Sequence, residues 1–491
     1  MKLIYDVSDK PPFGKNLVFA LQQMIAIMAA TLLVPIIVTG YGLESDPAAA
    51  LFGAGIGTLV YLLFTKRKSP VFLGSSFTFL GAYLATVQQN YGYWGVMIGV
   101  LFAGLVYVLI AVIMKFTGSK WVNKLMPAVI IGPIVTLIGL SLSGTATSWM
   151  SGNGGDGYSL ITILVGFFTF LIIVLASVKG TKSMKLIPFI IGVAAGYLLA
   201  LVLTLIGKGT GAESLVILDF TPFKTAFSPF TWRSIVDYPK FYFLRAIETK
   251  GQFAPIDGTA IANIALIYVP IAVVELAQHI SDHMNLSSII GKNLLQDPGL
   301  DKTLMGDGVG SIVGAFFGGA ANTTYGESIG CVAITGDAST STISVAGVCC
   351  MILSFFTPFV AFVNSIPKCV MGGACVALYG FIAVSGLQML HNVDLGDNKN
   401  LYVVSAILVT GIGGLTLNFG HNEITGGSVL TITSLATALI AGLITNLLIR
   451  GKHPADDEIN DDNLAADVDN FASVKISEED YQARKKKEKK S

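Results

Sequence analysis

The chain has 491 residues, of which 53% are hydrophobic and 13% charged, and its formal net charge is zero. An average soluble domain carries about 25% charged residues, so this composition excludes an ordinary soluble protein and indicates a polytopic membrane protein. No basic surplus points to nucleic acid as a partner. The five cysteines are odd in number and fall in apolar stretches, which predicts packing residues rather than a disulfide framework.

Long apolar stretches follow one another along most of the chain. A membrane-spanning helix needs about 20 mostly apolar residues, and the first stretch is too long for a signal peptide. Two further segments, 70–90 and 322–340, are apolar but broken by small and polar residues. The stretches that qualify are 17–39, 48–64, 94–114, 125–143, 159–178, 186–206, 259–281, 305–321, 343–363, 370–388, 400–418 and 428–449.

Together these stretches predict an all-α polytopic membrane protein with about 14 transmembrane segments. The broken segments stand third in each set of seven. An odd number of spans per half places the halves in opposite orientations, so we expect two inverted seven-helix repeats. Matched breaks in the two halves are also the sequence signal for a transporter binding site.

The connections between the stretches differ in charge. Lysine and arginine gather at 2–15, 66–68, 115–124 and 179–185, which are alternate connections. The positive-inside rule therefore predicts that both termini lie in the cytoplasm. We expect the protein in the cytoplasmic membrane. Loop 207–258 is a basic exception that we interpret as an external excursion. The tail 451–491 is a polyampholyte, for which we expect a solvated, disordered segment.

The broken segments contain Leu73-Gly-Ser-Ser-Phe77 and Thr323-Thr-Tyr-Gly-Glu327. Each puts an extended run of small residues before a half-length helix. Two half-helix N-termini near the middle of the membrane would offer free backbone N–H groups to a carbonyl oxygen or an anion. The alternative is a surface loop, or a pair of re-entrant kinks without a ligand.

Glu275 and His279 lie one turn apart in an apolar stretch and therefore share a helix face. They suggest a substrate contact and a proton-handling partner. His279 is expected near enough to the helix end to reach water. Asp307, at the expected start of the next helix, is either an N-cap or a member of the same network.

A metal site is the alternative for this helix. His279 and His283 stand at helical spacing with Glu275 nearby, which makes a partial zinc site. However, Asp282 and His283 are expected where the helix leaves the membrane, and no further ligand cluster follows. An intramembrane metalloenzyme is therefore the disfavoured reading; we expect no cofactor other than a coupled proton.

Several ordered motifs resemble the nucleobase/ascorbate transporter family, and among its members the bacterial uracil permeases. The resemblance covers about residues 10–450. It rests on Gly74-Ser-Ser-Phe77, Glu275-Leu-Ala-Gln-His279, Asn322-Thr-Thr-Tyr-Gly-Glu327-Ser-Ile-Gly330 with Thr335, and Val370-Met-Gly-Gly373 leading to Tyr379-Gly380.

The resemblance implies a fourteen-helix fold, often dimeric, in which short strands of the third and tenth segments pair at the membrane midplane. It implies a cytoplasmic N-terminus (1–14), a core domain (15–118 and 259–364), a gate domain (119–206 and 365–450), an extracellular loop (207–258) and the tail (451–491). It also implies substrate contacts from Glu275, Glu327, Phe77, Gly326, Ser76, Tyr325 and Tyr379, and proton coupling through His279, Glu275 and Asp307.

Two positions depart from the family pattern. Asn usually follows the acidic or amide residue of the signature, whereas this chain has Ser328. Many relatives have Gln-His in the first helix, whereas this chain has Gln22-Gln23, and Gln23 cannot titrate. Glu rather than Gln at position 327 resembles the uracil branch more than the xanthine and urate branch.

These features lead us to expect a transporter rather than an enzyme. Uracil presents ring N–H donors and carbonyl acceptors in one plane, which matches carboxylate acceptors at Glu275 and Glu327 opposed by helix-end N–H donors. We expect uracil uptake coupled to a proton, with the lipid bilayer and a second copy of the chain as partners. A xanthine or urate permease on the same fold is the alternative.

Overall fold

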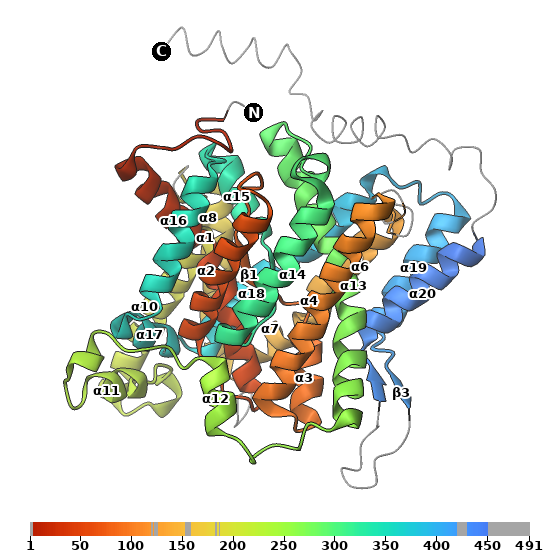
Figure 1. Cartoon of the computed structure of the whole chain (residues 1–491). Helices are drawn as coiled ribbons and strands as arrows, with labels where there is room; N and C mark the ends of the chain where they lie inside the picture. Colours follow the sequence, from red (N-terminus) through yellow and green to blue (C-terminus); the bar gives the residue numbers. More distant parts are fainter. Residues whose placement is uncertain are drawn as a thin grey trace.

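The computed structural model describes residues 3–118, 121, 126–152, 159–181, 184–185, 187–419 and 430–449. Most of these residues are helical (Figure 1). The helices are α1 (Phe13–Gly40), α2 (Pro47–Phe64), α3 (Leu80–Gln88), α4 (Gly92–Thr117), α6 (Ala128–Ser141), α7 (Ser143–Met150), α8 (Leu160–Lys179), α10 (Pro188–Thr210), α11 (Thr221–Phe227), α12 (Tyr242–Glu248), α13 (Gly258–Ile290), α14 (Leu300–Gly318), α15 (Gly326–Thr335), α16 (Thr340–Leu353), α17 (Thr357–Asn364), α18 (Lys368–Met389), α19 (Asn398–Ile412) and α20 (Ser434–Ile449). The strands are β1 (Leu73–Ser75), β2 (Asn322–Thr324), β3 (Leu417–Phe419) and β4 (Leu430–Ile432).

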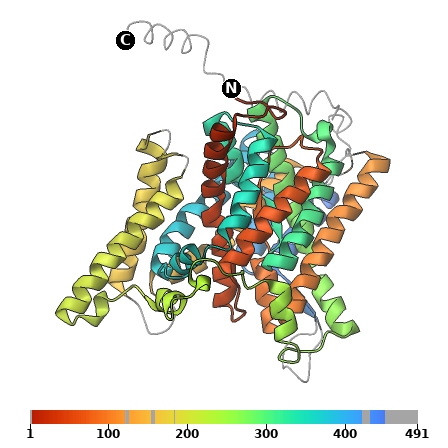
Figure 2. The ribbon, with the colours of Figure 1, turned by 60° about the vertical axis from the view of Figure 1, so that its left-hand side comes forward.

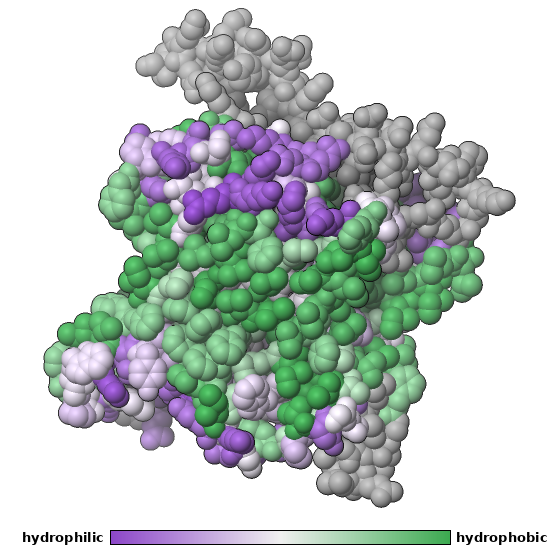
Figure 3. Space-filling view, in the orientation of Figure 1, coloured by the Kyte–Doolittle hydropathy of each residue, from purple (hydrophilic) through white to green (hydrophobic). Residues whose placement is uncertain are grey.

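The face of the molecule shown in Figure 3 carries a broad apolar band between two polar ends. Within the described residues, eight helical segments are long and apolar enough to cross a membrane: α1, α2, α4, α6 with α7, α8, α10, α13 and α18. Band and helices together confirm the predicted polytopic, mostly helical membrane protein.

Two sets of helices pack mainly among themselves. In the first set, α2 packs against α14 and α16, α14 against α4, and α1 against α16. In the second set, α18 packs against α6, α7 and α8, and α19 packs against α6 and α20. Figure 2 shows α8 and α10, in yellow, as a pair at one side of the molecule. Helices α1, α2 and α4 near the start of the chain thus belong to one set, and α18, α19 and α20 near its end belong to the other.

Close contact between α2 and α14 depends on glycine. A Cβ atom at Gly57 would meet the side-chain amide of Asn322 and the carbonyl oxygen of Gly310, and one at Gly314 would also meet Asn322. Small residues let helix backbones approach closely where lipid offers no hydrophobic driving force between helices. The narrow α2–α14 contact is what brings strand β2 against both helices.

Both broken segments contain a three-residue strand followed by a short helix, namely β1 with α3 and β2 with α15. The strands pair antiparallel, with Gly74 opposite Thr323. Lipid cannot satisfy the backbone groups of a chain that has left its helix. The pairing supplies those partners from inside the protein.

The structure corrects several predicted boundaries. Helix α13 continues to Ile290, well beyond the expected end at residue 281, so His279 and His283 are both buried inside it. The stretch 343–363 is divided into α16 and α17, and α14 begins at Leu300 rather than residue 305. Helix α19 ends in a glycine-rich run at 411–414, and residues 417–419 and 430–432 pair as a second antiparallel strand pair.

Loop 207–258 is folded onto the body of the protein. It contains α11 and α12, and its Lys240 and Arg245 form ion pairs with Glu44 in the connection between α1 and α2. The hydroxyl of Tyr242 is 3.2 Å from the hydroxyl of Ser45 in the same connection. The basic residues of the loop therefore attach it to the α1–α2 connection. The predicted tail 451–491 lies outside the described residues.

Candidate functional site

The strand pair forms the centre of the candidate site. The hydroxyl of Tyr325, directly after β2, donates to the carbonyl of Ser75 at 2.7 Å. Its ring occupies the space that a Cβ atom of Gly74 would need. Ser311 donates to the carbonyl of Asn322, which anchors β2 to α14. Tyr325 therefore fixes the two strands, and its hydroxyl is already engaged.

Glu275 faces this strand pair from α13. Its side chain is 1% exposed, and the hydroxyls of Thr323, Thr78 and Ser76 lie near its carboxyl group. Among the described residues, however, neither carboxylate oxygen has a hydrogen-bond partner of good geometry, and the hydroxyls of Thr78 and Thr323 also lack one. Buried polar groups are normally paired. An unpaired cluster of this kind is ready to bind a polar ligand.

Helix α13 presents two rows of polar side chains. Glu275, Gln278 and Asp282 recur at spacings of three and four residues and therefore share one face. Asp282 accepts a hydrogen bond from the hydroxyl of Thr324 in β2 at 2.7 Å. The first row therefore faces the strands, and Gln278 and Asp282 belong to it. The sequence did not mark Gln278 or Asp282 as candidate substrate contacts, although their spacing from Glu275 was a usable signal.

The second row contains His279 and His283 and faces α2 and α14. The Nδ1 atom of His279 is 2.6 Å from a carboxylate oxygen of Asp307, and its Nε2 atom is 3.1 Å from the hydroxyl of Thr303. Asp307 lies inside α14, seven positions after its first residue Leu300, so the N-cap interpretation is wrong. All of these side chains are fully buried. The expectation that His279 reaches water is therefore wrong.

His283 continues this buried network. Its ring stacks on that of His279, with ring centroids 4.2 Å apart. Its Nδ1 atom is 2.8 Å from the carbonyl of His279, and its Nε2 atom is 2.7 Å from the hydroxyl of Tyr61 on α2. Within the described residues, no group of three or more His, Cys, Asp or Glu side chains is arranged to hold a metal ion.

The two helix sets meet at Phe77 and Tyr379. Phe77, two residues after β1, lies edge-to-face with the ring of Tyr379 on α18, with centroids 5.6 Å apart. The hydroxyl of Tyr379 has no hydrogen-bond partner among the described residues. Glu327 is partly exposed in the first turn of α15. A Cβ atom at Gly326 would have open space, with only the ring of Phe381 of α18 at 4.0 Å.

The two positions that depart from the family pattern contact each other. The side-chain amide of Gln23 on α1 donates to the carbonyl of Ser328 at 3.3 Å. The hydroxyl of Ser328 in turn accepts a hydrogen bond from the backbone N–H of Phe72, just before β1. Gln23 and Ser328 therefore join α1, α15 and the first broken segment.

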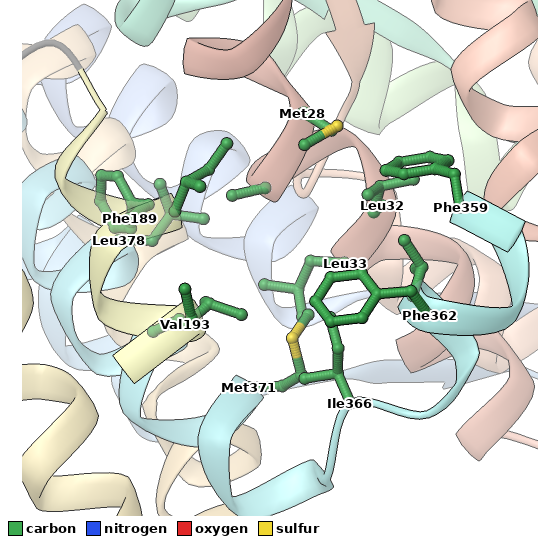
Figure 4. A pocket seen from close by; sticks show the side chains of 15 residues that line it. Met28, Leu32, Leu33, Phe189, Val193, Phe359, Phe362, Ile366, Met371 and Leu378 are labelled. Atoms are coloured by element: carbon green, nitrogen blue, oxygen red, sulfur yellow. The ribbon is translucent and has the colours of Figure 1, made fainter. Parts of the chain in front are cut away.

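An apolar cavity of about 90 Å³ lies between the two helix sets (Figure 4). Its lining comes from α1, α10, α17 and α18 and is apolar throughout, with Met28, Leu33, Phe362 and Met371 among the side chains. A nucleobase would leave its N–H and carbonyl groups unpaired there, which is costly. The cavity is therefore unsuited to a polar substrate, unlike the cluster around Glu275.

Comparison with known proteins extends this picture to the whole chain. A family model described as "Permease family" matches residues 14–419. The chain is 37% identical to the uracil permease of Bacillus caldolyticus, covering 95% of this chain and 99% of that protein. It is 35% identical to the uracil permease of Bacillus subtilis strain 168 (91% and 95% covered) and 33% identical to that of Escherichia coli strain K12 (90% and 94% covered).

Solved structures share the fold at low sequence identity. The transmembrane domain of the cyanobacterial bicarbonate transporter BicA has a TM-score of 0.54 and 15% identity, covering 90% of this chain and all of that one. The structure of SLC26A9 has a TM-score of 0.54 and 12% identity, covering 88% of this chain and 64% of that one. With the family match and these full-length relatives, the chain belongs to the permease family, the nucleobase/ascorbate transporter family that its motifs indicate.

Proposed function

We propose that this chain carries uracil into the cell together with a proton. The observation that carries the proposal is the buried carboxylate of Glu275, which has no hydrogen bond of good geometry among the described residues and lies beside the hydroxyls of Thr78 and Thr323. Carboxylate oxygens only accept hydrogen bonds, so the ligand they fit must bring N–H donors. The ring N–H groups of uracil are such donors, and the chain's full-length relatives are uracil permeases.

The substrate site comprises the strand ends and the first polar row of α13. Glu275 and Glu327 accept from the base, with Gln278 and Asp282 beside them. Backbone N–H groups at Phe77, in the turn before α3, and at Gly326, the first residue of α15, donate to the carbonyl oxygens. The first N–H groups of a helix have no partner within it. The ring of Phe77 lies against the base and Tyr379 faces the site from α18, while Ser76 lies beside Glu275 and Tyr325 positions the strands.

We assign proton binding to the second row of α13, which contains His279 and His283. Asp307 and His279, joined at 2.6 Å, form a pair in which one proton can be shared between a carboxyl group and an imidazole. Glu275 belongs to the face of the first row and lies one turn before His279. Protonation in the buried network therefore alters the charge that Glu275 meets, which couples the proton to the substrate.

Transport requires the two helix sets to move relative to each other. We assign residues 15–118 and 259–364 to a core domain and residues 119–206 and 365–450 to a gate domain, in a fold of 14 spans built from two inverted repeats. The separate packing of the two helix sets supports this division. The strand pair would lie at the membrane midplane, both termini in the cytoplasm, and two copies would form a homodimer.

Uptake of labelled uracil into liposomes containing the purified protein tests the function. An inwardly directed proton gradient should drive accumulation, and a proton ionophore should abolish it. Competition with unlabelled xanthine and uric acid distinguishes the alternative xanthine or urate permease. Accumulation that ignores the proton gradient would exclude proton coupling, and stronger competition by xanthine than by unlabelled uracil would exclude uracil as the substrate.

A further inference from the structure

The N-terminal segment, residues 4–9, lies along the connection between α15 and α16. The backbone N–H of Ile4 donates to the carbonyl of Gly336 at 2.7 Å, and the N–H of Ala338 donates to the carbonyl of Tyr5 at 3.0 Å. Residues Tyr5 and Asp337 form a parallel β-bridge. The N-terminal segment is thus fastened directly after the end of the half-helix α15.

Two side-chain contacts extend the same attachment. The hydroxyl of Ser339 donates to the carbonyl of Asp9 at 2.6 Å, and the hydroxyl of Thr340 donates to the carbonyl of Val7 at 3.0 Å. Val7 itself is buried in the main hydrophobic core. Main-chain pairing, hydroxyl contacts and a buried apolar anchor together make this a defined interface rather than a loose terminus.

The same segment is also bound to α13. Asp6 forms an ion pair with Lys292, with the nitrogen 2.6 Å and 2.7 Å from the two carboxylate oxygens. Lys292 directly follows Gly291, the left-handed residue that ends α13. Residues 4–9 therefore connect the end of α13 to the end of α15.

These two helices carry the acceptors of the proposed substrate site, Glu275 on α13 and Glu327 on α15. Near the site, their spacing is set by β2, through the hydrogen bond from Thr324 to Asp282. Helix α15 has only ten residues, and Gly326, Glu327, Gly330 and Ile334 on it are not fully buried. Packing on one side does not by itself fix such a short helix along its axis.

We propose that residues 4–9 are a tie that holds α15 at a fixed position relative to α13, and that Asp6 and Lys292 are positioning residues for the substrate site. The inference rests on the proposed function, because it uses Glu275 and Glu327 as substrate acceptors. Breaking the tie lets α15 shift, so the substrate loses affinity although no residue that contacts it has changed.

Charge reversal tests the tie. Asp6→Lys and Lys292→Asp should each weaken uracil binding, measured by calorimetry on the purified protein, by about three- to fivefold, as expected for a half-exposed ion pair. The double variant Asp6→Lys/Lys292→Asp should return the dissociation constant to within about twofold of the wild type, as restored pairs do in double-mutant cycles. Deletion of residues 3–9 removes every contact and should weaken binding more than either single variant.

A matched ion pair on the same end of the molecule provides the control. Lys68 and Asp297 are 2.6 Å apart and join the connection after α2 to the connection before α14. Lys68→Asp should leave uracil affinity unchanged, since this pair touches neither α15 nor the N-terminal segment. A shift in affinity as large as that of Lys292→Asp would show that charge at this end, rather than the tie, controls binding.

The readouts separate positioning from folding and from the proposed function. If Asp6 and Lys292 are positioning residues, each single variant should raise the KM for uptake and the dissociation constant, while maximal uptake per folded protein stays the same. The double variant Asp6→Lys/Lys292→Asp should restore both constants. Loss of maximal uptake with unchanged affinity, or absence of rescue in the folded double variant, would overturn the tie. Wild-type protein that binds no uracil would refute the proposed function instead, whatever the variants do.

Discussion

Replacing Glu275 by Gln separates binding from stability more cleanly than any other change at the site. The substitution keeps the shape of the side chain and removes its charge. In the structure Glu275 is 1% exposed, and its carboxylate oxygens have no hydrogen bond of good geometry among the described residues, although three hydroxyls lie near them. The protein without substrate therefore bears the cost of burying this group, and the substrate relieves it.

The size of the two effects follows from this environment. An unpaired buried polar group costs about 1–3 kcal/mol, and a charged one costs more. Removing the charge should stabilise the substrate-free protein by about 1–2 kcal/mol and raise its melting temperature by about 1–2 °C for a chain of this length. A hydrogen bond to a charged acceptor contributes about 1.5–3 kcal/mol, so uracil binding should weaken by about 10- to 150-fold.

Thermal unfolding with and without uracil measures both effects in one series. The wild type should be stabilised by uracil, whereas Glu275→Gln should melt higher without uracil and respond little to it. Glu213→Gln, at an exposed position in loop 207–258, is the control and should match the wild type in both respects. A Glu275→Gln protein that melts lower without uracil yet binds uracil normally would refute the reasoning.

Three further changes test other parts of the structure. Gly74→Val should prevent folding, because its Cβ would run into the ring of Tyr325, whereas Gly81→Ala has open space; size-exclusion chromatography checks both, and a normal Gly74→Val profile would contradict the strand geometry. Ala374→Leu should fill the 90 Å³ cavity between the helix sets and stabilise the present arrangement of the two sets by up to about 2 kcal/mol, which should slow uptake about tenfold or more. Unchanged uptake would show that the cavity plays no part in the movement of the two helix sets. The Lys292 ammonium holds the pKa of Asp6 below its usual value. The ion pair's contribution to stability is therefore complete above about pH 4 and disappears as pH falls through the lowered pKa. The difference in melting temperature between wild type and Asp6→Asn should stay constant from pH 7 to 5, and a difference that closes by pH 6 would contradict this assignment.

The sequence predicted the helical membrane fold because its apolar stretches are long and separated by charged connections. It also located both broken segments, since small and polar residues interrupt an otherwise apolar run there. The end of α13 was predicted too early, because residues 282–288 are mostly polar and therefore indicate a segment outside the membrane. In the structure Ser287 and His283 are buried against other helices, so hydropathy did not report their surroundings.

Contacts between segments that lie far apart in the chain could not be predicted from the sequence. Asp307 meets His279, and Gln23 meets Ser328, across 28 and 305 positions of the chain. Such pairs depend on how the helices cross, which periodicity within one helix does not reveal. Periodicity did contain the first row of α13, since Glu275, Gln278 and Asp282 repeat at helical spacing, but only the position of β2 shows which face of α13 meets the strands.

In the proposed mechanism, the arrangement of α13 couples a proton to the substrate without a shared contact. Glu275 lies one turn before His279, and the row that includes Glu275 faces the strands while His279 faces Asp307. At such short range a unit charge acts strongly on its neighbour, because little water is present to screen it. In the proposed mechanism, a proton gained in the histidine network favours a negative charge on Glu275, and that charge strengthens the hydrogen bonds that Glu275 accepts from uracil. Uracil bound at Glu275 would then favour the protonated network by the same free energy, since linkage between two sites is reciprocal.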